Sequence, residues 1–258
     1  MAIELGRSLG ATLVGLAIVD EPDIRAGAST GFGGATYKQQ RDEALLKDAH
    51  EHAQQWIDTF ARQCGAAGVS ARVLELRGRP EDMILEEMQQ HDLTLLGRHV
   101  NFRFETDAAD RKTRDTVLHR AGKPVLVVPE EPRQAGPTVL AAYDGSSAAK
   151  RALRSFAESG LARDRAVQVT TVGDDGAAAW ETAAKGVELL GELGVKASAH
   201  SIVSTLSIAQ ALLDRRARLS AGMIVLGAYT HSRFSQLLWG SVTRELVEKT
   251  EVPLFLQH

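Results

Sequence analysis

The sequence predicts an α/β fold of two tandem doubly wound parallel sheets of the five-stranded type, the first of which lacks its strand 1. Short apolar runs alternate with longer helical patterns, which is typical of parallel strands covered by helices on both faces. This alternation occurs twice along the 258 residues. The second copy starts with an apolar run, whereas the first copy starts inside a helical pattern.

The composition is that of a globular protein, with 44% apolar and 24% charged residues. The net charge of −3 excludes a general binder of nucleic acid or of anionic membranes. No apolar run approaches the ~18 residues that span a membrane. The single Cys64 fits a reducing compartment, and the first residues lack the basic start and apolar middle of a signal peptide. We therefore expect a cytoplasmic protein.

The second copy carries the complete pattern of strand and helix in turn. Its strands read as short apolar runs, as expected when both faces of a sheet are buried. The predicted strands are Thr138–Tyr143, Val167–Val172, Lys196–Ile202, Met223–Leu226 and Leu254–Leu256. The predicted helices lie near Ser147–Ser159, Ala177–Leu193, Ser207–Ala217 and Val242–Thr250.

The two copies are joined at Pro129–Pro137, where prolines and a glycine between apolar strands indicate a linker. We therefore expect one domain at residues 1–130 and another at 137–258. The strand end Leu96-Gly97 of the first copy recurs as Leu226-Gly227 in the second.

The first copy differs at its start. Its strand Leu13–Val19 matches Val167–Val172, so the counterpart of Thr138–Tyr143 would fall before Met1. Strand 1 is central in a doubly wound sheet, and without it two neighbouring strands keep unpaired backbone groups. Either the chain is truncated at its start, or a rebuilt or swapped strand fills the position. The first copy also has a longer Gly/Ser/Thr-rich loop, Asp20–Arg41.

The segment Met223–Leu256 has the pattern of a phosphate-binding loop. An apolar strand ends at Gly227, a polar loop follows, and Gly240-Ser241 precedes a helical pattern. Glycines let a backbone approach a ligand closely, and a helix N-terminus offers unpaired N–H groups to an anion.

These residues resemble a tandem universal stress protein. The nucleotide-binding signature of that family is Gly, two residues, Gly, nine residues, and then Gly-Ser or Gly-Thr. Gly227 and Gly240-Ser241 match the signature, whereas Thr230 stands in place of its second glycine. The segment Val139–Ser147 also resembles the family, whose aspartate at the end of strand 1, here Asp144, lies against adenine and ribose.

The resemblance implies an adenine-nucleotide α-hydrolase-like fold and a site for ATP or AMP in the second domain. The residues expected to form the site are Asp144, Val172, Gly227, Thr230, Gly240, Ser241 and Val242. Positive charge would come from His231, Arg233 and Arg244.

Other interpretations of the same residues stay open. Ser241 fits a helix N-cap, and Asp144 fits an Asx turn. Thr230 weakens the nucleotide interpretation, because a Cβ costs ~1–2 kcal/mol in a left-handed backbone.

The resemblance extends to the first copy, where Arg77–Ile84 resembles the Gly-x-Pro turn of the family and Val117–Pro124 its final helix and strand. The loop between them, however, has Val100 in place of the second glycine and Arg111-Lys112 in place of Gly-Ser. No nucleotide is therefore expected in the first domain. The basic residues of this loop leave two interpretations, a site for another anion or a solvated loop.

No catalytic or metal centre is predicted. Ser146-Ser147 lacks a paired base and a G-x-S-x-G turn, and no Walker A lysine follows the glycines. His50 and His52 fall on different faces of a predicted helix and cannot chelate together. Cys64 is expected to be a packing residue.

We therefore expect a stress-response regulator that binds an adenine nucleotide and is not an enzyme, with weak ATPase activity left open. The alternative is a nucleotide-free scaffold that acts through protein surfaces. Family resemblance implies an intramolecular pseudo-dimer paired through Pro124–Val128 and Pro253–Leu256. A further homodimer and an unknown protein partner are left open.

Overall fold

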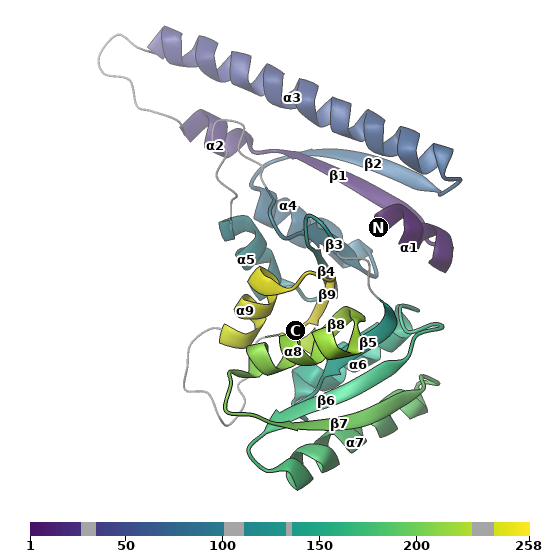
Figure 1. Ribbon diagram of the computed structural model, residues 1–258. Coiled ribbons are helices and arrows are strands. Elements are labelled where there is room, and N and C mark those ends of the chain that lie inside the picture. Colours follow the sequence, from purple (N-terminus) through teal and green to yellow (C-terminus); the bar gives the residue numbers. More distant parts are fainter. Residues whose placement is uncertain (27–34, 101–110, 133–135, 229–239) are drawn as a thin grey trace. The chain divides into compact units, whose positions relative to one another are not determined.

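The computed structural model describes residues 1–26, 35–100, 111–132, 136–228 and 240–258 (Figure 1). The chain divides into two compact units. The first comprises Met1–Glu87 with Val100–Arg114, and the second comprises Met88–His99 with Asp115–His258. The units cross the boundary between the sequence repeats, because the last two strands of the first repeat belong to the second unit.

A parallel two-stranded sheet is the centre of the first unit. Its strand β1 pairs with β2 in register from Leu13 opposite Ala71 to Val19 opposite Arg77. The elements of this unit are α1 (Ala2–Leu9), β1 (Leu13–Val19), α2 (Glu21–Ala26), α3 (Ala35–Ala66), β2 (Ala71–Arg77) and α4 (Pro80–Glu87).

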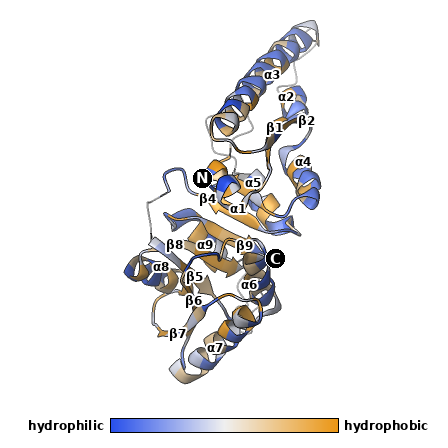
Figure 2. Ribbon diagram, turned by 90° about the vertical axis from the view of Figure 1, so that its right-hand side faces the viewer, coloured by the Kyte–Doolittle hydropathy of each residue, from blue (hydrophilic) through white to orange (hydrophobic). Residues whose placement is uncertain are grey.

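The long helix α3 covers one face of this sheet. Its buried positions Ala49, Ala53, Ile57 and Cys64 recur at helical spacing, and the rest of its surface is mostly hydrophilic (Figure 2). Val19 of β1 packs against Ala49 and Ala53. One face of α3 therefore forms the core of the first unit.

The second unit contains one seven-stranded sheet with the order β3-β4-β9-β8-β5-β6-β7. Its strands are β3 (Thr94–Gly97), β4 (Val125–Val128), β5 (Gly136–Ala142), β6 (Val167–Gly173), β7 (Ala197–Val203), β8 (Ala221–Gly227) and β9 (Leu254–Gln257). Its helices are η1 (Met88–Gln90), most of α5 (Arg111–Arg120), α6 (Ser147–Glu158), α7 (Gly176–Glu192), α8 (Ile208–Leu219) and α9 (Ser241–Lys249).

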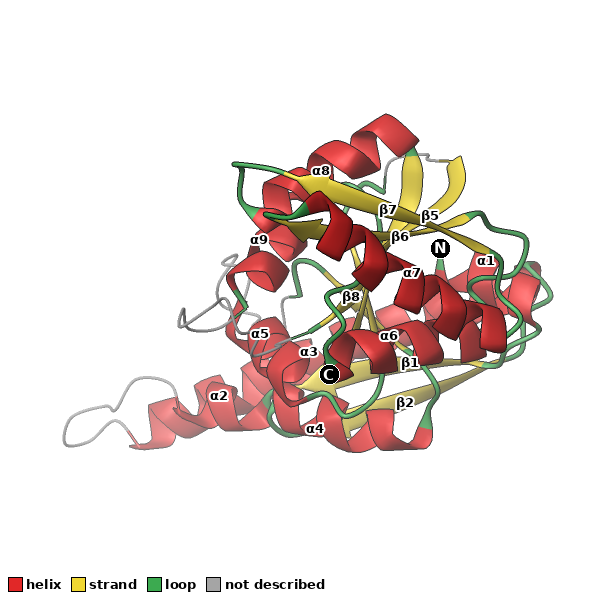
Figure 3. Cartoon of the chain, turned by 90° about the horizontal axis from the view of Figure 1, so that it is seen from below, coloured by secondary structure: helices red, strands yellow, loops and turns green. Residues whose placement is uncertain are grey.

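Within that sheet, the five strands of the second repeat are mutually parallel and follow the doubly wound order expected from the sequence. Helices α6 and α7 pack together on one face and α8 and α9 on the other (Figure 3). Gly186 of α7 lies against Val169 of β6, whereas Arg215 of α8 bonds Gln168, whose side chain points the other way. The α/β fold predicted from the sequence is confirmed.

The final strands of the two repeats meet in this sheet. β4 pairs with β9 antiparallel, with Val125 opposite Leu256 and Val127 opposite Leu254. All four side chains are at most 3% exposed. This is the strand pairing that the family resemblance implied for Pro124–Val128 and Pro253–Leu256.

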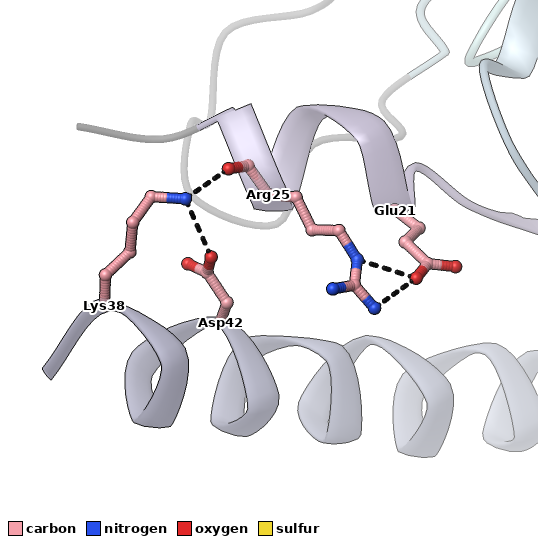
Figure 4. A network of polar contacts seen from close by, with 4 residues as sticks. All are labelled: Glu21, Arg25, Lys38 and Asp42. Carbon is pink, nitrogen blue, oxygen red and sulfur yellow. Dashed lines mark hydrogen bonds and ion pairs between the residues drawn. The ribbon is translucent and has the colours of Figure 1, made fainter. Parts of the chain in front are cut away.

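The segment Asp20–Arg41, predicted as one loop, contains α2 and the first turns of α3, so that prediction was wrong for its described residues. Asp20 Oδ1 accepts a hydrogen bond from the backbone N–H of Asp23 and caps α2. Figure 4 shows the contacts that follow: Arg25 pairs with Glu21, and Lys38 of α3 reaches both the Arg25 carbonyl and the Asp42 carboxylate. These contacts tie α2 to α3.

Pro137, predicted to end the linker, lies inside β5. The register of β5 against β8 shifts between Gly136 and Val139, which is a β-bulge or a similar irregularity. A proline cannot donate to a strand ladder and is tolerated at such a position. The second repeat thus begins its sheet earlier than Thr138.

None of the helices in the described part of the chain is long and apolar enough to cross a membrane.

Candidate functional site

The site predicted in the second repeat lies at the carboxyl ends of parallel strands. β5 is flanked by β6 and β8, and the chain continues from β5 toward one side of the sheet and later returns to the other. Ala141 of β5 lies opposite Val225 of β8, so Asp144 and Ala228 leave the sheet side by side. Crevices at such a switch point are where open α/β sheets bind ligands.

Asp144 follows β5 and forms a turn. Its Oδ1 accepts a hydrogen bond from the N–H of Ser146 at 3.0 Å, and Ser146 Oγ in turn accepts from the N–H of Ala149 at 3.1 Å. Gly145 between them has φ 80°, a conformation that favours glycine. Asp144 is exposed to solvent. Burial, and secondarily the charge of Asp144, raise the pKa of Tyr143. The Asx turn is therefore present, and it leaves the carboxylate at the surface of the edge.

Gly227 ends β8 where no side chain fits. A Cβ at this position would lie 2.4 Å from the backbone nitrogen of Ala149 and 2.6 Å from the carbonyl carbon of Ala148. Both atoms belong to the first turn of α6. The glycine thus brings the end of β8 against the backbone that follows the Asp144 turn. The sequence signal for this contact is the pair of small residues after Ser147, which the sequence pattern alone does not connect with Gly227.

Gly240 and Ser241 form the start of α9, but Ser241 is not the N-cap that its position in the sequence suggested. Gly240 is the N-cap, with φ 40° and ψ 50°, and Ser241 is the first helical residue. No side chain caps this helix in the described residues, whereas α6, α7 and α8 are capped by Ser146, Asp175 and Ser207. The first N–H groups of α9 have no intrahelical acceptor.

The start of α9 belongs to the same edge of the sheet. β8 and β9 are parallel, and α9 connects them, so the helix runs back from the carboxyl end of β8. Its N-terminus therefore lies at the end where Asp144 and Gly227 leave the sheet. Ser241 is exposed, Val242 is half-buried and Thr243 is buried.

Val172 lies near the end of β6 at the same edge. It is half-buried and stands opposite Ile202 of β7. Val172 belongs to the neighbour of β5 on one side, and Gly227 belongs to its neighbour on the other. Asp144 thus leaves the sheet between the two.

Thr230, His231 and Arg233 lie outside the described residues. Arg244 is exposed in the first turns of α9, and its N–H donates to the Gly240 carbonyl at 2.8 Å. The weakening of the nucleotide site by Thr230 therefore stays a prediction from the sequence.

In the first repeat, Arg111 and Lys112 are the first residues of α5. They occupy the helix start that Gly240 and Ser241 occupy in the second repeat. The loop before them, residues 101–110, lies outside the described part.

Groups of three or more metal-ligating side chains do not occur among the described residues. His50 contacts Glu75, and His52 contacts Asp48. Cys64 is buried, and burial raises the pKa of its thiol, which keeps the thiol protonated.

The fold and this edge define a doubly wound α/β protein with two tandem repeats. Residues 1–129 and 137–257 each match the Universal stress protein family. The chain therefore belongs to the universal stress protein family.

Individual relatives agree. The chain is 24% identical to universal stress protein Slr1230 of Synechocystis sp., over 97% of this chain and 91% of that protein. A solved universal stress protein from Archaeoglobus fulgidus covers 99% of this chain and 92% of its own, with a TM-score of 0.73 at 20% identity. Another universal stress protein from that organism, solved in complex with dAMP, matches 46% of this chain and 95% of its own at 26% identity, with a TM-score of 0.37.

Proposed function

We propose that the protein is a stress-response regulator that binds ATP or AMP in its second repeat. The observation that carries the proposal is the start of α9, where Gly240 leaves the first N–H groups without a side-chain cap among the described residues. This helix start opens at the switch-point edge, which suits a phosphate. Asp144 and the β6 end at Val172 would then face the ribose and adenine.

The N–H groups of Ser241 and Val242, with the Ser241 hydroxyl, are the proposed phosphate ligands. Their attraction for an anion combines unpaired donors with the positive end of the helix dipole. Gly227 contributes by letting β8 end close to α6, which keeps a side chain out of the edge. We propose binding without turnover, since the described residues at this edge offer no general base that can be assigned beside the phosphates.

Gly240 offers a matched pair of variants that tests this. Its left-handed backbone suits Asn or Asp better than other side chains, so both substitutions keep the helix start. Gly240→Asp places a carboxylate on the proposed phosphate donors, whereas Gly240→Asn places a neutral group of the same size there. We expect Gly240→Asp to abolish ATP binding in calorimetry and Gly240→Asn to retain more of it.

Thermal unfolding supplies an independent measurement. Saturation at about 100 times the dissociation constant stabilises the native protein by ~2.7 kcal/mol through linkage. Absence of both heat and thermal shift with millimolar ATP or AMP would contradict the proposal.

The alternative is a nucleotide-free scaffold of the stress response. It is favoured by Thr230 in the signature and by Arg111-Lys112 at the corresponding helix start of the first repeat. Adenine nucleotide that co-purifies with the protein and is released on denaturation would exclude it. We also propose a cytoplasmic location, because Cys64 is a free thiol, and a pseudo-dimer of the two repeats through β4 and β9.

A further inference from the structure

A set of polar side chains lies on one face of β6 and β7, the outer strand pair of the larger sheet (Figure 1). Gln168 lies opposite Ser198, and Thr170 lies opposite His200. Opposite residues on neighbouring parallel strands share a face and are about 4.8 Å apart. Helix α7 packs on the other face of this strand pair, whereas Arg215 of α8 reaches Gln168 on the polar face. The polar residues therefore lie on the side of the sheet that α8 occupies.

Thr170 places a buried hydroxyl in the middle of this face. Its side chain is 1% exposed, and Oγ1 has no hydrogen-bond partner within the described residues. Its neighbours across the sheet are Ala142 on one side and His200 on the other. The adjacent Thr171 differs, because its hydroxyl donates to the Tyr143 carbonyl at 2.6 Å. A buried hydroxyl without a partner costs free energy, which a bound acceptor would recover.

Positive charge gathers beside this hydroxyl. The Nε of Arg215 donates to Gln168 Oε1 at 2.7 Å, which orients the guanidinium and leaves its terminal N–H groups for another acceptor. Arg218 follows one turn later on the same side of α8 and is exposed. No carboxylate in the described part of the chain pairs with either arginine, whereas Arg216 between them pairs with Glu251 at 3.2 Å.

These cations also act on one another. Burial, and then the charge of Arg215, lower the pKa of His200. Burial, and then the charge of Arg218, lower the pKa of the Arg215 guanidinium. The nearest carboxylate along α8, that of Asp214, accepts a hydrogen bond from Gln210 at 2.8 Å. An anion bound among the three basic groups would relieve their repulsion.

The first repeat shows that the fold does not need polar side chains here. Its strands β1 and β2 correspond to β6 and β7, and Val14, Leu16 and Leu74 stand at the positions of the three polar residues nearest α8. A basic residue at the end of a helix, such as Arg218, complements the helix dipole. The dipole explains neither the buried hydroxyl nor His200.

We propose that this face binds a small tetrahedral oxyanion of the phosphate class. The site, called the Thr170 site below, consists of Gln168, Thr170, His200, Arg215 and Arg218. Its donors come from two strands and a helix, which suits a tetrahedral anion better than a planar carboxylate. It lies toward the amino ends of the strands and is separate from the nucleotide site proposed at their carboxyl ends.

Inorganic phosphate is the probe, added to the full chain at constant ionic strength made up with sodium chloride. NMR signals of the His200 ring and the Arg215 Nε–H report on the Thr170 site, and the amides of Ser241 and Val242 report on the start of α9. We expect saturable shifts at the Thr170 site and a rise in the pKa of His200, because a bound anion favours the imidazolium form. Sulfate should act similarly and acetate much more weakly.

Two variants with a matched control test the residues. Arg215→Gln should weaken phosphate binding by about tenfold, whereas Arg154→Gln, which removes an exposed charge from α6 on the other face, should leave it unchanged. Thr170→Val removes the hydroxyl and keeps the shape of the side chain. We expect it to weaken phosphate binding several-fold while the melting temperature stays level or rises, because an unpartnered buried group is lost. A purely structural hydroxyl would instead lower the melting temperature and leave phosphate affinity unchanged. If Arg215→Gln fails to fold, Thr170→Val decides.

Four results would overturn the proposal. The first is no saturable shift at the Thr170 site, and the second is an equal response to acetate, which would indicate general screening. The third is unchanged phosphate affinity in both Arg215→Gln and Thr170→Val. The fourth is loss of the His200 response in Gly240→Asp, which would make the Thr170 site part of the nucleotide site. Absence of ATP binding at the start of α9, in contrast, would contradict the proposed function and leave the phosphate response of His200 in place.

Discussion

The two repeats share one sequence pattern, yet among the described residues the strands of the second repeat lie in one sheet and those of the first are divided between two. In the second repeat, β5 bonds β6 on one side and β8 on the other. In the first, the counterparts of β6 and β8 are β1 and β3, and these belong to separate sheets. In the second repeat, the central strand β5 joins the strand pair β6–β7 and the strand pair β8–β9 in one sheet.

The two repeats also differ in how a strand packs against the helix that covers it. In the first, Gly15 of β1 faces Phe60 of α3, and a Cβ on the glycine would lie 2.6 Å from the ring. At the corresponding positions of the second, Val169 of β6 faces Gly186 of α7, and a Cβ there would lie 2.8 Å from the valine. The larger residue of the pair lies on the helix in the first repeat and on the strand in the second, and the space between strand and helix is filled in both.

The largest expected effect separates the two strand ends. Gly227→Ala places a Cβ inside the backbone of α6, and we expect a loss of roughly 3 kcal/mol in the free energy of unfolding. Gly97→Ala, at the corresponding exposed end of β3, should change it by less than ~0.5 kcal/mol. Urea denaturation followed by circular dichroism measures both. Equal losses would show that the contact with α6 is not what requires glycine.

The size exchange can be tested by a double-mutant cycle. Gly15→Val should cost about 2 kcal/mol through overpacking, and Phe60→Gly should relieve that clash, with a favourable coupling of ~1–2 kcal/mol in the double variant. The mirror cycle, Val169→Gly with Gly186→Phe, is expected to couple with the same sign. Stability by urea denaturation gives the coupling energies. Strictly additive effects in both cycles would contradict the exchange.

A smaller effect is expected at the turn after β5. Ser146→Ala removes the acceptor for the Ala149 N–H and should destabilise α6 by ~1 kcal/mol. Ser147→Ala, one position later, is the control and should have an effect below ~0.5 kcal/mol. Thermal unfolding of the two variants is sufficient to distinguish them, and a reversed order would assign the cap to Ser147.

The smallest effect concerns pH. Burial, and then the charge of Arg215, lower the pKa of His200 on β7. The unfolded state therefore binds more protons than the native state near the ordinary histidine pKa of about 6.5, and this contribution to stability is present above that pH and lost as pH falls toward the folded pKa. We expect His200→Asn to flatten the fall in melting temperature on acidification. A slope unchanged by the substitution would assign the pH dependence to other groups.

Much of the fold follows from local pattern. The strand predicted at Val167–Val172 is β6, Val167–Gly173, and the helix predicted near Ser147–Ser159 is α6, Ser147–Glu158. The helices hidden in Asp20–Arg41 were missed although their signals are local: a capping aspartate and the i, i+4 pair of Glu21 with Arg25. Glycine-rich composition around them outweighed those signals.

The division of the first repeat between two sheets could not be predicted in detail, because strand pairing depends on partners distant in sequence. At the candidate site, the sequence indicated the edge to which Asp144, Val172 and Gly227 belong. It did not indicate that Gly227 is required by α6, since that contact joins residues far apart along the chain. Nucleotide binding by these residues stays a prediction.

The antiparallel pairing of β4 with β9 has a consequence for how the chain can be divided. A cut between the sequence repeats would remove β4, one of the two neighbours of β9, and expose Phe255 and Leu256, which are buried beside β4. We expect a fragment that starts at Gly136 to aggregate, because β9 would be an exposed edge strand with unpaired backbone groups. A fragment that starts near Met88 keeps β3 and β4 and closes that side of the sheet. The sequence repeat and the compact structural unit are thus different stretches of this polypeptide.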